Sequence, residues 1–487
     1  MSHKLDYIHE QLQLLEKDME DSLTLKSHSW QFLEKEQKES AQNLIRYLTL
    51  RNKDIRDLQD KLHEKGLSSL ASSESHILRQ IQNIRKWLGH VYHENQLDPC
   101  THSSGRDKLI SRSNKLFGKK PEKGIPHLMV TFDSEFSSDL EKVKSLLQKG
   151  MDVARINCAH DNPEVWKEMI HQIRKACQET GLDCKIYMDL AGPKIRTKLL
   201  GKGSEKGKTK IQEGDLIWMT EAQKHVDKKG IWISPGEKGV INSLLSGERV
   251  YIDDGMIRCV VENLEEHKVA LRVERVSTKK NFIKNSKGIN FPDSRLNVPS
   301  LTVYDKSCLS FICQHADLIG YSFVRTAQDI AELRKALLNI SPTYPHIILK
   351  IETKEAVDKL PELLLEALKE PAAGIMIARG DLAVEIGFER LSEIQEEILW
   401  ICEAAHLPVI WATQVLESLH KFGLATRSEI TDAAHAGMAE CIMINKGPYT
   451  EKVLEFLNDI LKRRSSHRIK KRFIFRPLKI AERFFKS

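Results

Sequence analysis

Short apolar runs alternate with stretches of helical periodicity over the carboxyl-terminal two thirds of the chain. Eight runs of three to five residues have the length and composition of buried strands: 127–131, 153–157, 186–189, 318–322, 347–351, 375–378, 409–412 and 442–444. Seven of the eight segments that follow these runs carry apolar residues at three- and four-residue spacing, which predicts helices. The last of these helices is expected over 450–463. Eight strand–helix units predict an α/β protein with a closed (β/α)8 TIM barrel.

Two segments depart from this alternation. Residues 198–299, after the third strand, show the period of two that is typical of strands, as in VYIDDGMIRCVVEN and HKVALRVERV. We therefore expect a β-rich domain inserted into the barrel. Residues 1–98 carry only helical periodicity, which predicts a small helical domain that packs on the barrel or on a partner. A coiled-coil dimer is an alternative interpretation of the same segment.

These patterns divide the chain into six parts. We predict an N-terminal helical domain, a polar linker, the first part of the barrel, the inserted β domain, the second part of the barrel and a basic tail. The corresponding residues are 1–98, 99–124, 125–197, 198–299, 300–464 and 465–487.

Composition narrows the class of protein. The 487 residues are 41% hydrophobic and 29% charged, which is typical of a water-soluble protein with a sizeable core. No apolar run approaches 18 residues, so no transmembrane span is expected, and the polar start of the chain has no signal-peptide core. Nine cysteines without a CxxC pair favour reduced thiols and a cytoplasmic protein.

The positive charge is concentrated at one end of the chain. Residues 462–487 hold eleven Lys or Arg against one Glu, which exceeds the net charge of +7 for the whole chain. The remaining residues therefore do not indicate nucleic-acid binding. Phe interleaved with Lys and Arg in the tail is compatible with weak contact with an anionic membrane surface, although a solvated tail partly folded onto the barrel is the simpler interpretation.

Charged residues close two neighbouring strand runs. Lys350 and Glu352 are two apart, so they share a face of one strand, and Asp381 follows the next strand. The carboxyl ends of barrel strands carry the active site in proteins of this fold. A cation and two carboxylates suit a divalent metal and an anionic substrate. The spacing alone is equally compatible with a Lys–Glu ion pair and a helix-capping Asp.

Six motifs in order along the chain resemble those of the pyruvate kinases. They are DVARINCAH (152–160), MDLAGPKIRT (188–197), IDDGMI (252–257), KGINFP (287–292), KIE with GIMIARGDLAVEIG (350–352 and 374–387) and PVIWATQVLESL (408–419). The resemblance implies a barrel with a β lid over the active site. It also implies transfer of a phosphoryl group from phosphoenolpyruvate to ADP, which gives pyruvate and ATP in the last step of glycolysis.

The same resemblance implies catalytic and metal-binding roles. Glu352 and Asp381 would hold Mg²⁺ or Mn²⁺, and Lys350 would stabilise the transferring phosphoryl group and the developing enolate. Arg155 would grip the phosphate, because a guanidinium fork fits phosphate oxygens. Thr413 would belong to the network that protonates the methylene carbon, although a lone strand-end Thr is more often bonded to backbone.

Further positions would contact the substrate or the nucleotide. Arg196 would face the phosphates, and the backbone around Gly380 at a helix start would bind the substrate carboxylate. Asn157 and His160 would lie near the cation site and the nucleotide, and Lys287 would reach phosphates from the lid. Taken singly, Asn157 and His160 are equally well read as a strand terminator and a helix-start histidine.

The chain departs from the family pattern around the monovalent cation. Pyruvate kinases that need K⁺ carry a Glu where Lys194 stands and a Ser where Ala159 stands. A lysine ammonium can supply the charge that K⁺ otherwise brings. We therefore predict an enzyme that does not require K⁺, with Asp189 pairing with Lys194 or a neighbour. A surface lysine without such a role is the alternative.

Other departures lie at the strand ends and at the end of the chain. TFDSEF follows the first strand and MINKGPYTEK the eighth, where the family has other sequences, so nucleotide preference is expected to differ. About 25 residues follow the barrel, which predicts a truncated type without the effector domain and without the subunit contact that this domain makes. We separately expect a homo-oligomer. Another metal-dependent barrel enzyme on pyruvate or phosphoenolpyruvate, such as a lyase or aldolase, and a non-catalytic regulatory relative are the competing hypotheses.

Overall fold

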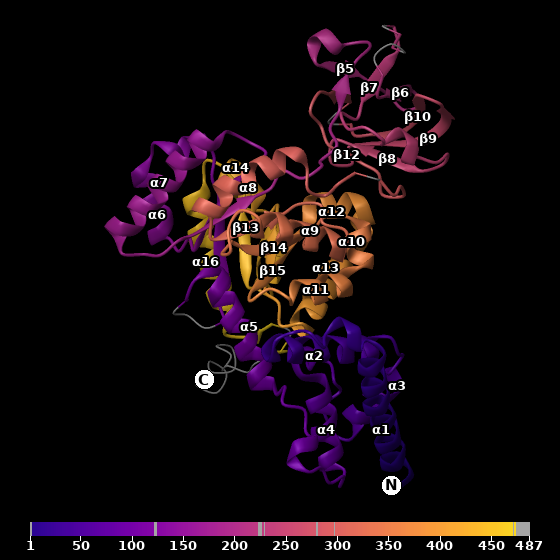
Figure 1. The fold of residues 1–487 in the computed structure, drawn as a ribbon, viewed down its shortest axis with the longest axis vertical. Helices are drawn as coiled ribbons and strands as arrows, with labels where there is room; N and C mark the ends of the chain where they lie inside the picture. The colour runs from indigo at the N-terminus through magenta and orange to yellow at the C-terminus, as the bar shows by residue number, and fades with distance from the viewer. Residues whose placement is uncertain are drawn as a thin grey trace, which may run out of the picture.

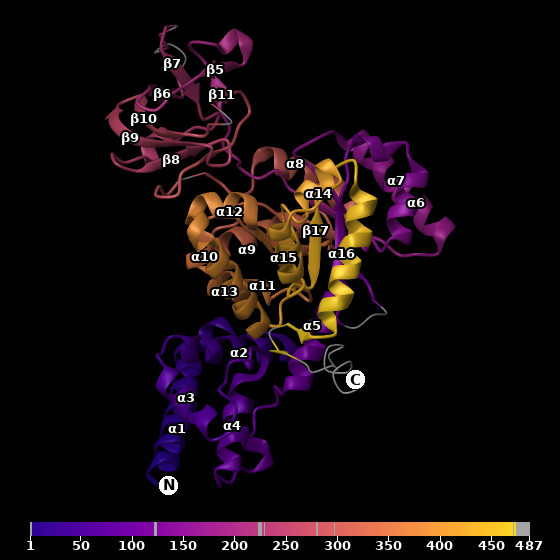
Figure 2. The same ribbon diagram turned by 180° about the vertical axis from the view of Figure 1, so that it is seen from behind.

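The computed structural model describes residues 2–120, 124–222, 226–227, 229–278, 281–296, 298–470 and 472–473. Three regions follow one another along the long axis of the molecule (Figure 1). The amino-terminal helices lie at one end, the barrel in the middle and the β-rich insertion at the other end. The view from behind shows the same order, with the last helix running along the outside of the barrel (Figure 2).

Eight parallel strands close the barrel. They are β1 (His127–Thr131), β2 (Val153–Asn157), β3 (Lys185–Asp189), β13 (Leu318–Tyr321), β14 (His346–Ile351), β15 (Ala373–Ala378), β16 (Val409–Ala412) and β17 (Cys441–Ile444). Each predicted strand overlaps an observed one. Around the ring the order is β1-β17-β16-β15-β14-β13-β3-β2, so the first and last strands pair. The predicted (β/α)8 barrel is confirmed.

Alternation along each strand separates two apolar layers. Side chains that point inward fill the barrel, and those that point outward pack against the surrounding helices. The inner layer includes Met129, Val153, Tyr187, Ile348 and Met376. Ile347, Leu349 and Ile375 belong to the larger outer core. Since Ile348 points inward, Lys350 and Glu352 two and four residues later are directed to the interior at the carboxyl end of β14.

Several of the helices that surround the barrel begin at a side-chain cap. The surrounding helices are α6 (Leu140–Gln148), α7 (Pro163–Thr180), α8 (Val303–His315), α9 (Ala327–Leu338), α10 (Lys354–Asp358), α11 (Leu360–Ala367), α12 (Arg379–Ile386), α13 (Leu391–Ala404), α14 (Glu417–Phe422), α15 (Arg427–Ala436) and α16 (Thr450–Ser465). Asn162, Thr302 and Thr326 each accept a hydrogen bond from the backbone N–H three residues on. The predicted last helix corresponds to α16.

The insertion after β3 is β-rich, as predicted, and has its own apolar core. Its strands are β4 (Lys198–Leu199), β5 (Lys208–Lys210), β6 (Leu216–Thr220), β7 (Ile231–Ser234), β8 (Arg249–Ile252), β9 (Ile257–Glu265), β10 (Lys268–Val276), β11 (Phe282–Lys284) and β12 (Ile289–Asn290). Seven of them form one sheet in the order β12-β8-β9-β10-β6-β7-β4. Asn290 on β12 donates to Glu385 on α12 over 3.0 Å, which ties the insertion to the barrel.

Four helices make up most of the amino-terminal region: α1 (Ser2–Leu25), α2 (Lys35–Arg51), α3 (Arg56–Glu64) and α4 (Ile77–Trp87). The buried face of α1 carries Ile8, Leu12, Leu15 and Met19 at spacings of four, three and four. This face packs on α2, α3 and α4 of the same chain. The apolar periodicity is therefore satisfied inside one helical unit, and the coiled-coil alternative is not needed to bury it.

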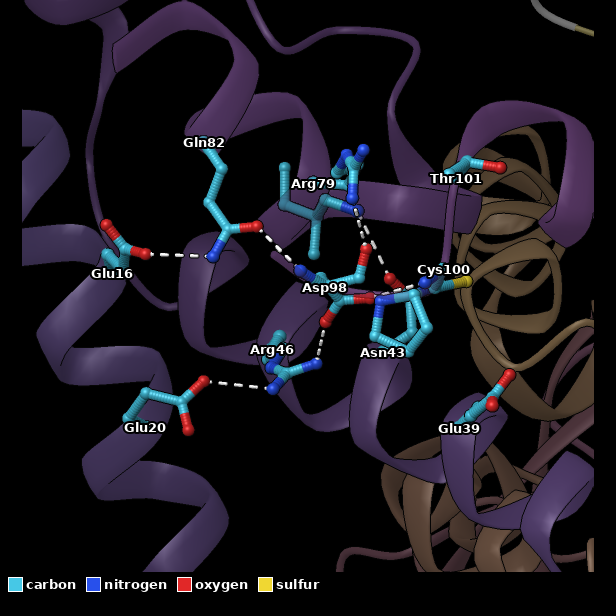
Figure 3. A network of polar contacts seen from close by, with 12 residues as sticks. Glu16, Glu20, Glu39, Asn43, Arg46, Arg79, Gln82, Asp98, Cys100 and Thr101 are labelled. Atoms are coloured by element: carbon cyan, nitrogen blue, oxygen red, sulfur yellow. Dashed lines mark hydrogen bonds and ion pairs between the residues drawn. The ribbon is translucent and has the colours of Figure 1, made fainter. Parts of the chain in front are cut away.

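A polar network ties this helical unit to the next segment of the chain (Figure 3). Asp98 is at its centre: its N–H donates to Gln82 over 2.8 Å, its carbonyl accepts from Arg79 over 2.9 Å, and its carboxylate pairs with Arg46. Gln82 in turn donates to Glu16 on α1 over 3.0 Å. Because every helix but α3 contributes to these bonds, the segment that leaves the domain has a fixed course.

That segment differs from the polar linker expected over 99–124. It contains helix α5 (His102–Phe117), which begins at the Thr101 side chain. At its end, Leu116 and Phe117 join the apolar layer inside the barrel. The polar composition of the segment belongs to the exposed turns of α5, while a few buried residues hold it under the barrel. Residues 121–123 lie outside the described part.

Buried hydrogen bonds dock the amino-terminal helices on the barrel. Asn43 on α2 donates to the carbonyl oxygens of Glu74 and Ala404 over 2.7 and 2.8 Å. His406, which is fully buried after α13, has one ring nitrogen 2.9 Å from Ser40 Oγ and the other 2.9 Å from the carbonyl oxygen of Ser75. The helical region and the barrel therefore share one continuous core at this end.

Two further observations concern expectations from the sequence. No helix in the described residues is long and apolar enough to cross a membrane. Most of the basic tail, residues 471 and 474–487, lies outside the described residues, and with it the expected membrane-surface contact.

Candidate functional site

A cavity of about 250 Å³ opens at the carboxyl ends of the barrel strands. Nine of the residues singled out from the sequence line it: Arg155, Asn157, His160, Lys194, Arg196, Lys350, Glu352, Asp381 and Thr413. They come from β2, β14 and the segments after β2, β3, β14, β15 and β16. Gly380 lies beside the cavity, since a Cβ there would be 3.8 Å from Thr413 Oγ1. Lys287 does not line it and pairs with Asp253 of the insertion at 3.0 Å.

Lys350 is the most deeply enclosed cation of the cavity, and its side chain is 10% exposed. Its ammonium lies 2.6 Å from Ser322 Oγ, 3.2 Å from Glu352 Oε1 and 3.3 Å from Asp189 Oδ2. Burial acts to lower the pKa of Lys350, but Asp189 and Glu352 outweigh it, so its pKa is raised. Lys350 is therefore a permanent positive charge held from three sides.

Asp189 joins this lysine to the neighbouring arginine. Its Oδ2 accepts from Nε of Arg155 over 3.1 Å, and Arg155 also donates to Thr131 Oγ1 over 3.1 Å. Burial acts to raise the pKa of Asp189, but Lys350 and Arg155 outweigh it, so its pKa is lowered. One buried carboxylate thus fixes two of the cations that line the cavity, Arg155 and Lys350.

Glu352 and Asp381 are close enough to influence each other. The pKa of Glu352 is raised, by burial first, and the Asp381 carboxylate raises it further. Glu352 Oε2 accepts from the backbone N–H of Phe323 over 2.6 Å, which orients the carboxylate. Two such carboxylates in one cavity fit a divalent cation, because a cation between them offsets their repulsion.

Lys194 does not pair with Asp189, the first partner considered from the sequence. Its ammonium lies 2.8 and 3.0 Å from the two carboxylate oxygens of Asp381. The reason is that Asp189 is already surrounded by Arg155, Lys350 and Tyr187 deeper in the barrel. Lys194 therefore places a positive charge against one of the two metal-binding candidates.

Thr413 is held in an unusual conformation at the end of β16. Its φ is +68°, and Gln414 and Leu416 also have positive φ, which is rare for β-branched and bulky residues. Thr413 Oγ1 is buried without a hydrogen-bond partner among the described residues. Backbone strain and an unpaired polar atom that faces a cavity are both typical of a functional position.

Arg379, the first residue of the RGD sequence, points away from the cavity. Its Nε donates to the carbonyl oxygen of Ala412 over 3.0 Å, its guanidinium pairs with Asp432 at 2.6 Å, and it stacks on Trp411 with 4.7 Å to the ring centroid. Arg379 therefore ties the start of α12 to β16. This bracing leaves the backbone at Gly380 and the Asp381 side chain on the cavity side.

A second cavity of about 400 Å³ shares Arg155, Asn157, His160 and Thr413 with the first. Its remaining lining includes residues that the sequence analysis did not single out: Asp133, Glu417, His420, Lys421 and Asn445. They follow β1, β16 and β17, so their position after predicted strands was the available signal. The pKa of His160 is lowered by burial and by Lys446 and Arg196, which keeps its ring neutral.

Comparison with known proteins agrees with the fold. Residues 127–450 match the family described as pyruvate kinase, barrel domain. A pyruvate kinase of Bacillus licheniformis is 33% identical over 338 residues, which cover 67% of this chain and 55% of that protein. A pyruvate kinase of Geobacillus stearothermophilus is 35% identical over 303 residues, which cover 62% of this chain and 49% of that protein.

A mammalian relative gives a similar result. Pyruvate kinase PKLR of Rattus norvegicus is 34% identical over 325 residues, which cover 63% of this chain and 54% of that protein. The chain spans about half the length of the curated relatives it matches. The matched residues contain all eight strands of the barrel, the β-rich insertion and every side chain that lines the two cavities. This chain belongs to the pyruvate kinase family.

Proposed function

We propose that this protein transfers the phosphoryl group of phosphoenolpyruvate to ADP and releases pyruvate and ATP. The observation that carries the proposal is the convergence of Lys350, Arg155, Glu352, Asp381 and Thr413 on one cavity. Phosphoryl transfer depends mainly on positioning and on neutralising charge, and this cavity offers cations, carboxylates and a hydroxyl within one small volume.

Glu352 and Asp381 are the residues that would hold Mg²⁺ or Mn²⁺. Carboxylate oxygens are the ligands these hard cations prefer. The bound ion would neutralise charge on the substrate carboxylate, the enolate oxygen and the phosphoryl group. The Asp381 oxygens keep lone pairs beyond those that face Lys194, so the ion pair and a metal bond are compatible.

Arg155, Lys350 and Arg196 would bind the phosphoryl group. Arg155 and Lys350 are fixed by Asp189, so their charges need no rearrangement when the substrate arrives. Arg196 is exposed and donates to the carbonyl oxygen of Ser286 over 3.1 Å, which leaves its guanidinium near the insertion. The backbone at Gly380, at the start of α12, would receive the substrate carboxylate.

Thr413 would take part in protonation of the methylene carbon of the enolate. Its Oγ1 has no other partner among the described residues, so it is available to a substrate or to a water molecule in the cavity. The strained backbone keeps this hydroxyl directed at the cavity and not at a neighbouring carbonyl.

The nucleotide would occupy the second cavity. Asn157, His160 and Arg196 lie on its border with the first cavity or beside it. Lys287 belongs to the insertion, where Asp253 holds it, so it would reach the phosphates only when the insertion approaches the barrel as a lid.

We also propose that catalysis does not require K⁺, with the Lys194 ammonium in its place. The support is chemical: Ala159 offers no hydroxyl, and both oxygens of Asp189 already have partners within the protein. Activity in buffers of K⁺, Na⁺ or tetramethylammonium should be similar, and Lys194→Gln should gain a dependence on K⁺. A loss of wild-type activity in tetramethylammonium would contradict this proposal.

The main experiment measures pyruvate formation with lactate dehydrogenase and NADH. Pyruvate should form only when phosphoenolpyruvate, ADP and Mg²⁺ are all present. Pyruvate released from another acid without ADP would instead indicate a lyase or aldolase. No pyruvate under any of these conditions would indicate a regulatory relative.

Assembly and location are the last part of the proposal. We expect a homo-oligomer in the cytoplasm, where all nine cysteines would stay reduced; none of them forms a disulfide in the structure. Light scattering of the purified protein would measure its mass against the 55.8 kDa of one chain.

A further inference from the structure

Tyr187 places a hydroxyl inside the barrel, directly beneath the cavity. It lies on β3 two residues before Asp189, so both side chains point to the interior. Tyr187 is fully buried among apolar residues of the inner layer. Its hydroxyl donates to Oδ1 of Asp189 over 3.2 Å.

Gly320 on the next strand makes room for this contact. Gly320 is paired with Asp189 in the register of β13 and β3. A Cβ at Gly320 would lie 2.0 Å from the Tyr187 hydroxyl oxygen and 2.4 Å from Asp189 Oδ1. Both distances are far below van der Waals contact, so a side chain here would force the tyrosine and the carboxylate apart. The absence of a side chain at Gly320 is therefore needed for the pair.

The two carboxylate oxygens of Asp189 contact different partners. Oδ2 faces the two cations, Arg155 at 3.1 Å and Lys350 at 3.3 Å, while Oδ1 accepts the Tyr187 hydroxyl. The bond to Oδ1 fixes the rotation of the carboxylate plane and so directs Oδ2 at both cations. At 3.2 Å this hydrogen bond is longer than most bonds between a hydroxyl and a carboxylate, so its main effect is to orient the carboxylate.

We propose that Tyr187 is a positioning residue of the phosphoryl-transfer site. Through Asp189, its hydroxyl holds Lys350 and Arg155 in the positions from which they face the substrate phosphate. This inference rests on the proposed pyruvate kinase activity. It assigns to the barrel interior a polar contact that supports the reaction, where apolar packing alone would be enough for stability.

Tyr187→Phe tests the proposal, because it removes the hydroxyl and keeps the ring. We expect kcat to fall about tenfold while KM for phosphoenolpyruvate changes less than about threefold, since Lys350 acts mainly in the transition state and small misplacements are costly. The melting temperature reports whether the variant is folded. An unchanged kcat in the folded variant would overturn the proposal.

Tyr321→Phe is the matched control. Tyr321 lies on β13, is 1% exposed, and has a hydroxyl without a hydrogen-bond partner among the described residues. Removing this hydroxyl should leave kcat unchanged. An equal loss in Tyr321→Phe and Tyr187→Phe would show a general effect of buried hydroxyls and overturn the positioning role.

Asp189→Asn shows whether Tyr187 acts through the carboxylate. In an Asp189→Asn background, Tyr187→Phe should change kcat by less than about twofold, because the group that transmits the effect is already altered. Full additivity of the two changes would overturn the proposed route through Asp189.

The wild-type protein separates this inference from the proposed function. If wild type forms pyruvate and Tyr187→Phe matches it, only the positioning role fails. If wild type forms no pyruvate from phosphoenolpyruvate, ADP and Mg²⁺, the proposed function fails and the positioning role fails with it.

Discussion

The two ends of the barrel both bury polar side chains, but they use them differently. At the carboxyl end, Lys350, Arg155 and Asp189 are ionised groups in contact with one another. At the amino end, the neutral side chains of Asn43 and His406 and the buried guanidinium of Arg112 are bonded to hydroxyl and backbone carbonyl oxygens, and no carboxylate takes part in these bonds.

The difference lies in which atoms remain available. The charged end lines a cavity and leaves Thr413 Oγ1 without a partner among the described residues. The amino end is covered by α5 and the amino-terminal helices. Both ring nitrogens of His406 and the side chain of Asn43 have hydrogen-bond partners there. Buried polar groups therefore line an open cavity at the carboxyl end of the barrel, whereas at the amino end they bind one another and the backbone. Changes at the first should reduce activity, and changes at the second should reduce stability.

The largest effect is expected for Lys350→Met. Loss of the ammonium should lower kcat about 1,000-fold, because a fixed charge at the transferring group is removed. Steady-state rates with phosphoenolpyruvate and ADP measure it, and circular dichroism checks the fold. Lys359→Met, on an exposed helix end, is the control and should keep wild-type kcat. A loss of less than tenfold would break the assignment of chemistry to this end of the barrel.

Asp381→Asn should weaken the metal site. We expect the Mg²⁺ concentration for half-maximal activity to rise about 100-fold, because one of two carboxylate ligands is lost. Titration of activity with Mg²⁺ and with Mn²⁺ measures the shift. Asp358→Asn, at an exposed position, serves as the control. An unchanged Mg²⁺ requirement would exclude Asp381 as a ligand.

Asn43→Ala tests the opposite end. Two carbonyl oxygens and the N–H of Ile77 would lose their partner, which should lower the free energy of unfolding by about 2–3 kcal/mol. Urea denaturation measures this change, and kcat of the folded protein should stay at the wild-type value. Asn52→Ala, at the exposed end of α2, should change stability by less than about 0.5 kcal/mol. A selective loss of kcat in Asn43→Ala would contradict the division of roles.

Acid should lower the free energy of unfolding through His406, at the amino end of the barrel. Burial lowers the pKa of His406 to about 3, whereas the unfolded chain has the ordinary value near 6.5. Between these values the unfolded state binds more protons, so this contribution is complete above pH 6.5 and declines as pH falls toward 3. From pH 8 to pH 5 the loss should be about 2 kcal/mol.

The matched variants isolate this effect. His406→Gln should lose about 2 kcal/mol of the stability difference between urea denaturation at pH 8 and at pH 5, at the cost of a lower stability at pH 8. The buried His76, whose pKa is lowered to about 4, keeps a contribution of its own in this variant. His63→Gln, at an exposed position of α3, should behave as wild type at both pH values. The same pH dependence in His406→Gln and wild type would assign the acid sensitivity to other groups.

The sequence could predict the site where periodicity and position in the barrel determine it. Lys350 and Glu352 share a face because strands have a period of two, and Asp381 is near them because β14 and β15 are neighbours. Nine of the residues named from the sequence line one cavity for these reasons. Their roles in catalysis remain predictions.

Contacts that depend on the position of a third residue or of a distant element could not be predicted in the same way. Lys194 pairs with Asp381, and Tyr187 meets Asp189 because Gly320 stands opposite, and both pairings depend on register and on empty space. Helix α5 was missed because its segment is polar overall, with few apolar residues such as Leu116 and Phe117 on its buried face. The N–H of Ile77 at the start of α4 donates to the side chain of Asn43, which lies 34 residues earlier in the chain.

The sequence by itself determined the eight strand–helix units, the β-rich insertion, the helical region and the charged residues at the strand ends. These follow from local periodicity and from the order of motifs, which neighbours along the chain specify. Only the tertiary structure decided which carboxylate holds which cation and how the amino-terminal helices close the barrel. Those contacts depend on which groups, far apart along the chain, meet in the same buried space. The pattern of residue types along the chain does not contain that information.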